Sequence, residues 1–152
     1  MKIYNLADKL DYLDNVVDWL YNEWGNHEGS GNRNYWESWV RSSLSQKDIP
    51  QTFIAVEKNI LIATFSLWRC DLQSRQDLFP WFGGLYVNSD YRNQGYGKQM
   101  QLAAFDILRE LGYKKVFCFA EFSDYYENMG WVFEEMIPDE KGEMVRLYSY
   151  KI

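Results

Sequence analysis

Apolar residues recur at helical spacing in three stretches of the chain. The first begins at Asp11, whose side chain is suited to cap a helix, and continues to Trp24. A glycine-rich loop, 25–32, interrupts the pattern before a second helix is expected from Trp36 to Leu44. The apolar face of the first helix is formed by Leu13, Val16, Val17 and Leu20.

The third helical stretch is the longest and covers residues 96–111. Gly112 follows it, at the position where glycine commonly ends a helix. A shorter helix is expected over 124–129, with Gly130 closing it. The buried face of the long helix is formed by Met100, Ala103, Ala104, Ile107, Leu108 and Leu111.

Short apolar runs between these helices predict strands. Residues 57–60 are short enough to join two of them as an antiparallel hairpin, and Gly83-Gly84 inside another indicates a bulge or a close approach of ligand. The predicted order of elements is β-α-α-β-β-β-α-β-α-β-β. This order indicates a protein of the α/β (α+β) class with a single domain over residues 1–152. The strands are expected at 3–5, 53–56, 61–68, 82–87, 115–120, 131–136 and 144–150.

Composition narrows the classes of function. The chain has 152 residues, 47% of them hydrophobic, which suits one compact domain. No apolar run approaches the length of a membrane span and no signal-peptide core is visible, so we expect a cytoplasmic protein without a membrane partner. A net charge of -6 argues against nucleic acid as a partner and suits a cationic substrate.

The residues that most often bind metal are scarce. Cys70 and Cys118 are far apart in sequence, and His27 is the single histidine. An ordinary zinc site cannot be assembled from this set, so no metal is expected. Catalysis by a histidine-activated Ser or Cys is disfavoured for the same reason.

The stretch 92–98 is the strongest candidate for a binding site. It lies between a predicted strand and the long helix, and its two glycines allow a tight turn that exposes backbone N–H groups to an anion. Gln99 stands where a Walker A loop needs Ser or Thr, and Met100 stands where a dinucleotide fingerprint needs glycine. A pyrophosphate site remains, formed by Arg92, Asn93, Gln94, Gly95, Tyr96, Gly97 and Lys98.

The pattern Arg-x-x-Gly-x-Gly in this loop resembles the acetyl-coenzyme A loop of the GCN5-related N-acetyltransferases, the GNAT family. A second segment, 125–131, resembles the family's Tyr-x-x-x-Gly-Phe motif, with Trp131 in place of Phe. The element order also matches over the full chain. The resemblance implies a central mixed, mostly antiparallel sheet of about seven strands flanked by four helices. Phe119 stands where many members have Asn, so that contact is not carried over.

The resemblance also implies roles for residues near the centre of the sheet. The backbone of Leu85, Tyr86 and Val87 would pair with the pantetheine arm, and an N–H near Leu85 would polarise the thioester carbonyl. Tyr126 matches the tyrosine that donates a proton to the departing thiolate. If the register is shifted by one residue, Tyr125 takes its place.

The general base is less well defined by the sequence. Glu121, which follows the fifth strand, is the first candidate, and Glu23, Asp71 and Asp124 are alternatives.

The leading hypothesis is therefore an acetyl-CoA-dependent N-acetyltransferase. It would move an acetyl group to a primary amine of a small molecule by direct attack in a ternary complex. Two alternatives stay open: acetylation of a peptide or protein N-terminus, and a non-catalytic acyl-CoA-binding module. The terminal strands would also be compatible with a homodimer.

Overall fold

The structure is a computed structural model that describes residues 1–25 and 31–152. His27 and residues 26–30 of the predicted glycine-rich loop lie outside the described part of the chain. No helix among the described residues is long and apolar enough to cross a membrane.

One seven-stranded sheet runs through the molecule in the order β1-β2-β3-β4-β5-β7-β6. Neighbouring strands are antiparallel except β4 and β5, which are parallel. The predicted mixed, mostly antiparallel sheet is thus confirmed. The strands are β1 (Lys2–Asn5), β2 (Gln51–Glu57), β3 (Ile60–Trp68), β4 (Trp81–Val87), β5 (Lys115–Ala120), β6 (Val132–Pro138) and β7 (Met144–Lys151).

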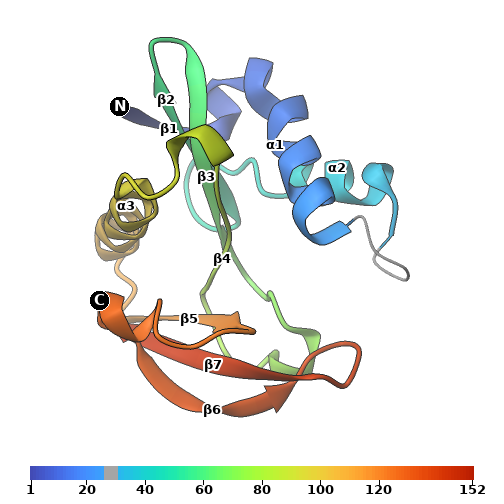
Figure 1. The fold of residues 1–152 in the computed structure, drawn as a ribbon, viewed down its shortest axis with the longest axis vertical. Coiled ribbons are helices and arrows are strands. Elements are labelled where there is room, and N and C mark those ends of the chain that lie inside the picture. Colours follow the sequence, from blue (N-terminus) through green and yellow to red (C-terminus); the bar gives the residue numbers. More distant parts are fainter. Residues whose placement is uncertain (26–30) are drawn as a thin grey trace.

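The α-helices cover the two faces of this sheet. Helix α3 (Tyr96–Glu110) lies on one face, and α1 (Leu13–Leu20) and α2 (Arg33–Arg41) lie on the other (Figure 1). Phe65 and Phe82 point from β3 and β4 into the core under α3. Ile54 of β2 belongs to the core under α1 and α2. The apolar faces predicted from the helical and strand periodicities therefore pack against each other in these two cores.

Two predicted helix features are wrong. Residues 124–129 do not form a fourth α-helix, because only Glu127–Met129 makes a short 3-10 turn. Asp11 does not cap the first helix, since Leu10–Tyr12 is itself a 3-10 turn and α1 begins at Leu13. Asp124 has a φ of +75°, which is incompatible with a helix starting there, and the turn at 10–12 runs directly into α1.

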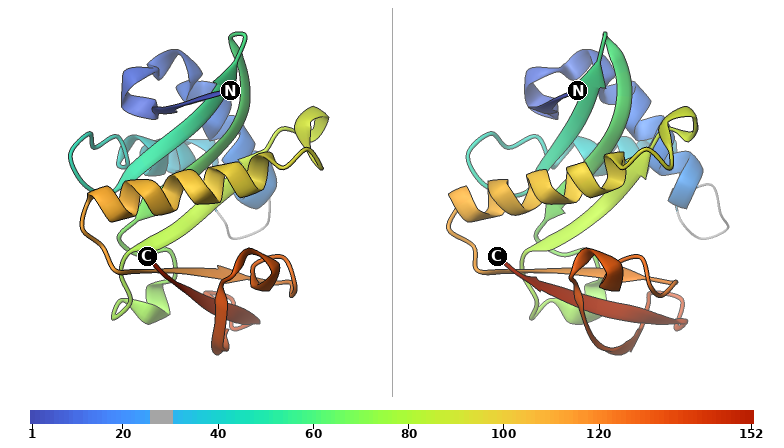
Figure 2. Two further views of the ribbon diagram at one scale, coloured as in Figure 1. Left: turned by 90° about the vertical axis from the view of Figure 1, so that its left-hand side faces the viewer. Right: turned by 60° about the vertical axis from the view of Figure 1, so that its left-hand side comes forward.

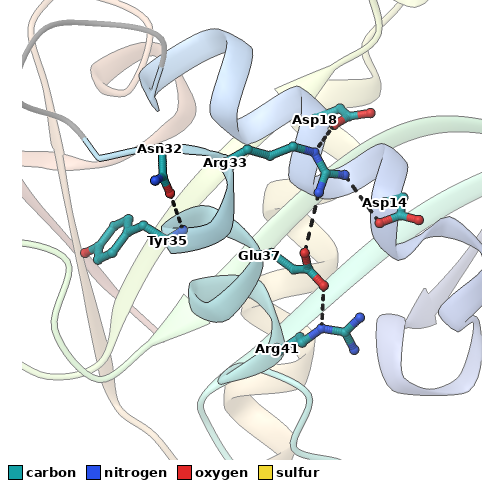
Figure 3. Close-up of polar contacts among 7 residues, drawn as sticks. All are labelled: Asp14, Asp18, Asn32, Arg33, Tyr35, Glu37 and Arg41. Carbon is teal, nitrogen blue, oxygen red and sulfur yellow. Dashed lines mark hydrogen bonds and ion pairs between the residues drawn. The ribbon is translucent and has the colours of Figure 1, made fainter.

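Helices α1 and α2 are joined by an exposed ion-pair network (Figure 3). The Arg33 guanidinium lies 2.7 Å from Asp18 and 3.3 Å from Asp14 of α1, and 3.5 Å from Glu37 of its own helix. The Asn32 side chain caps α2 by accepting a backbone N–H from its first turn. These contacts fix how α2 lies against α1.

The packing of α3 predicts unequal costs for two leucines of the same helix. Leu108 is fully buried, whereas Leu102 is 47% exposed. We expect Leu108→Ala to lower the free energy of unfolding by about 2–5 kcal/mol, because it leaves a cavity. Leu102→Ala should change it by less than about 0.5 kcal/mol. Urea unfolding measures both, and equal losses would contradict this packing.

Candidate functional site

The central feature of the site is the separation of β4 from β5. These parallel strands pair at one position, Trp81 with Phe117, where the Phe117 N–H donates to the Pro80 carbonyl at 3.0 Å. Beyond that pair the strands diverge: β2, β3 and β4 run upright in Figure 1, while β5, β7 and β6 run crosswise below them. The separation leaves one edge of β4 without a partner strand over most of its length.

The unpaired edge of β4 belongs to residues singled out in the sequence. The Asn88 N–H donates to Ile62 of β3 at 2.9 Å, so the backbone of Tyr86, two residues earlier, also faces β3. Backbone groups alternate along a strand, so those of Leu85 and Val87 face the separation. The structure therefore places the backbone of Leu85 and the N–H of Val87 where an amide-bearing ligand could pair with them, and turns the backbone of Tyr86 away.

A bulge interrupts β4 just before this edge. Ser66 pairs with Gly83 and Thr64 pairs with Tyr86, so β4 carries an extra residue, and Gly84 has a φ of +59°. The buried indole of Trp68 lies over both glycines: a Cβ would be 2.6 Å from its ring at Gly83 and 3.1 Å at Gly84. The glycine pair thus makes room for Trp68, and the predicted bulge is present.

The loop before α3 forms a cradle of backbone groups, seen at one end of the helix in Figure 2. Asn93 and Gly95 both have positive φ, +61° and +83°, and the helix begins at Tyr96. Gln99 N–H makes the first intrahelical bond, to the Gly95 carbonyl at 3.1 Å. The N–H groups of the first turn remain to bind an anion, and no atom lies within 4 Å of a Cβ placed on Gly95.

Two side chains of this loop support the cradle. Arg92 Nε donates to the Val87 carbonyl at 2.9 Å, and its guanidinium lies 5.2 Å from the centre of the Tyr86 ring. Gln94 Nε2 donates to the Asp90 carbonyl at 3.2 Å. Arg92 therefore ties the loop to the end of β4.

Tyr126 lies in the turn after β5 and packs into the core beneath α3. Its ring centre is 5.6 Å from that of Trp131 and 5.5 Å from that of Tyr148. Burial raises the pKa of the Tyr126 phenol well above its ordinary value, and the nearby Cys118 adds to the shift. The Tyr126 phenol therefore stays protonated at neutral pH.

Tyr125 points elsewhere, toward the start of α3. Its hydroxyl would lie 2.6 Å from a Cβ on Gly97. It accepts a hydrogen bond from Gln101 Nε2 at 3.2 Å, and the Gln101 Oε1 accepts one from Trp131 Nε1 at 2.8 Å. The fully buried Gln101 was not selected from the sequence. The sequence did hold a signal for it: Gln101 is a polar residue directly after Met100, within the apolar pattern that faces the core.

The candidate bases are distributed unevenly around the separation. Glu121 directly follows β5 and is exposed. Asp124 has a φ of +75°, and its N–H donates to Glu127 at 2.8 Å. Asp71 lies against β4: a Cβ on Gly83 would be 2.6 Å from its Oδ2. Burial raises the pKa of Asp71 to about 7.

The fold is that of an α/β transferase, and the start of α3 offers unpaired backbone N–H groups beside open space at Gly95. Residues 13–131 match the model of the acetyltransferase (GNAT) family, and the chain belongs to that family. It is an N-acetyltransferase that uses acetyl-CoA as acyl donor. The open space at Gly95 fits the pyrophosphate of that group. Among the described residues no group of three or more His, Cys, Asp or Glu side chains could hold a metal ion.

Solved structures support the fold. An aminoglycoside 6'-N-acetyltransferase complexed with coenzyme A is similar with a TM-score of 0.78 at 13% identity, covering 99% of this chain and 97% of that one. A ribosomal-protein-alanine N-acetyltransferase from Brucella melitensis is similar with a TM-score of 0.76 at 11% identity over 100% of both chains. No curated protein matches the sequence.

The cradle predicts a specific effect of a side chain at Gly95. We expect Gly95→Val to reduce acetyl-CoA binding at least about tenfold, because the added side chain would occupy the space above the first turn of α3 and strain a positive φ. Gly142→Val is a matched control, since Gly142 also has a positive φ and nothing within 4 Å of its Cβ position. Isothermal titration compares the two; equal affinities would remove Gly95 from the site.

Proposed function

We propose that the chain transfers an acetyl group from acetyl-CoA to a primary amine of a small molecule, by direct attack within a ternary complex. The observation that carries this proposal is the separation of β4 from β5. The cradle and Tyr126 lie on the side of this separation that α3 covers. The half-buried carboxyl group of Asp71 lies on the side that α1 and α2 cover. Such an opening would let donor and acceptor meet from opposite faces of the sheet.

Acetyl transfer requires an anchor for the cofactor, a donor to the carbonyl oxygen, a proton donor for sulfur and a base for the amine, and we assign a residue to each. The backbone N–H groups from Arg92 to Lys98 would hold the pyrophosphate, and the Leu85 N–H would donate to the thioester carbonyl oxygen. The amine nitrogen forms a bond to the carbonyl carbon as the carbon–sulfur bond breaks. Tyr126 would donate a proton to the departing sulfur, and a carboxylate, Glu121 or Asp71, would take one from the amine.

Two further properties support this assignment. Both cysteines, Cys70 and Cys118, are free, which suits the reducing cytoplasm that we propose as the location. The net charge of -6 favours a cationic amine over nucleic acid as partner.

Tyr126→Phe tests the proton donor. It removes only the hydroxyl, so the ring packing with Trp131 and Tyr148 remains. We expect turnover to fall about tenfold to a hundredfold, at the low end of acid–base effects because a thiolate is a good leaving group. The dissociation constant of acetyl-CoA should stay within about twofold. Unchanged turnover would remove Tyr126 from the mechanism and direct attention to Tyr125.

The function itself is tested in two stages on the wild-type protein. Isothermal titration with acetyl-CoA, with ATP and NAD as controls, should show binding of acetyl-CoA alone. Thiol release is then followed with a panel of small primary amines and with peptides that have free N-termini. Turnover with small amines supports the proposal, turnover with peptides alone replaces the acceptor class, and binding without any turnover supports a non-catalytic module.

A further inference from the structure

Asp71 lies at the point where β4 and β5 begin to separate. It follows β3 by three residues, and its carboxylate lies against Gly83 of β4. Gly83 is two residues beyond Trp81, the position where β4 pairs with β5. A carboxylate in this place is next to the opening through which an acyl group and an amine would have to meet.

The side of the sheet on which Asp71 lies can be assigned from its neighbours. Phe82 points into the core under α3, so the adjacent Gly83 faces the opposite side. Leu20 of α1 lies 3.6 Å from a Cβ placed on Gly84, which confirms that α1 covers this side. Asp71 is thus on the α1–α2 face, whereas Tyr126 and the start of α3 are on the other.

The Asp71 carboxylate is half-buried and has no hydrogen bond or ion pair to any side chain in the described part of the chain. The charge that acts on it is that of another carboxylate, Glu140, in the connection between β6 and β7. Its charge in turn raises the pKa of Cys118 in β5 and of Tyr126 across the separation. A poorly solvated carboxylate without a neighbouring cation lowers the stability of the folded protein. A contribution to stability therefore does not explain why Asp71 is at this position.

We propose that Asp71 is the general base that deprotonates the acceptor amine. This inference rests on the proposed acetyl transfer. An ammonium N–H proton moves to an Asp71 carboxylate oxygen, and the freed lone pair forms the N–C bond. As the C–S bond breaks, the electron pair left on sulfur takes the Tyr126 proton, and the second proton of the amine nitrogen passes to the Tyr126 oxygen. The products are a neutral amide, the free thiol and a protonated Asp71.

The environment of Asp71 suits this role better than that of Glu121. A base is most effective when its pKa is close to the working pH, and burial brings the pKa of Asp71 to about 7. The negative charge of Glu140 raises the pKa further and would favour an approaching ammonium ion. Glu121 is exposed at the end of β5, on the opposite strand of the separation.

The test uses three variants of the full chain: Asp71→Asn, Glu121→Gln, and Glu110→Gln at the exposed end of α3 as a control for charge removal. With the same acceptor amine, Asp71→Asn should lower kcat/KM about 100-fold or more. The rise in wild-type kcat/KM through about pH 7 should disappear in this variant. Titration should give the same acetyl-CoA dissociation constant for Asp71→Asn and wild type.

Thermal unfolding gives a readout that does not depend on activity. The folded pKa of Asp71 lies above the unfolded value of 3.8, so the native state holds this proton longer. Raising the pH from 5 to 8 should therefore destabilise the wild type relative to Asp71→Asn, and the Tm of the variant should gain on the wild type. A constant Tm difference would show that Asp71 is not held in the environment described above.

The outcomes separate this inference from the proposed function. If the wild type turns over an amine but Asp71→Asn keeps its rate and pH profile, Asp71 is not the base while acetyl transfer stands. If Glu121→Gln instead loses the rise near pH 7, Glu121 takes the role. If the wild type turns over no amine, the proposed function fails and the inference fails with it.

Discussion

The arrangement of the site depends on one constraint: β4 and β5 pair at a single position and then separate. Parallel neighbours in a sheet normally satisfy each other's backbone groups along their length. Here the edge of β4 at Leu85 and Val87 has no partner strand, and Arg92 Nε satisfies the Val87 carbonyl instead. The same divergence lets side chains from both faces approach one place. If β4 and β5 paired along their whole length, this edge would be buried. Tyr126 and Asp71 would then lie on opposite faces of an uninterrupted sheet.

Buried polar contacts hold the two sides of this opening in position. On the α3 side, Gln101 links Trp131 to Tyr125, and Glu127 accepts the Tyr148 hydroxyl at 2.8 Å, which fixes the turn that carries Tyr126. On the other side the glycine pair lets Trp68 lie flat on β4. The site is therefore built on the sheet and α3, with loops contributing the cradle and the acidic residues.

The strands, the three α-helices and the cradle could be predicted from the sequence because local signals specify them. These signals are hydrophobic periodicity, turn residues and the spacing of glycines. Residues 124–129 failed as a helix because tertiary contacts of Tyr126 and Glu127 outweigh helical propensity in so short a segment. Asp71 was one of several carboxylates in sequence. Only the fold brings it to Gly83, since that contact depends on the β3–β4 connection, which carries no periodic signal.

The hydrogen bonds at Gln101 have a fixed direction. An indole can only donate, so Trp131 determines which end of the Gln101 amide faces it, and the NH₂ group is turned toward Tyr125. The Tyr125 oxygen is thereby used as an acceptor, and its own hydrogen is left free to point outward beside the first turn of α3. A single tryptophan in the core thus sets the polarity of a hydroxyl group at the surface of the cradle.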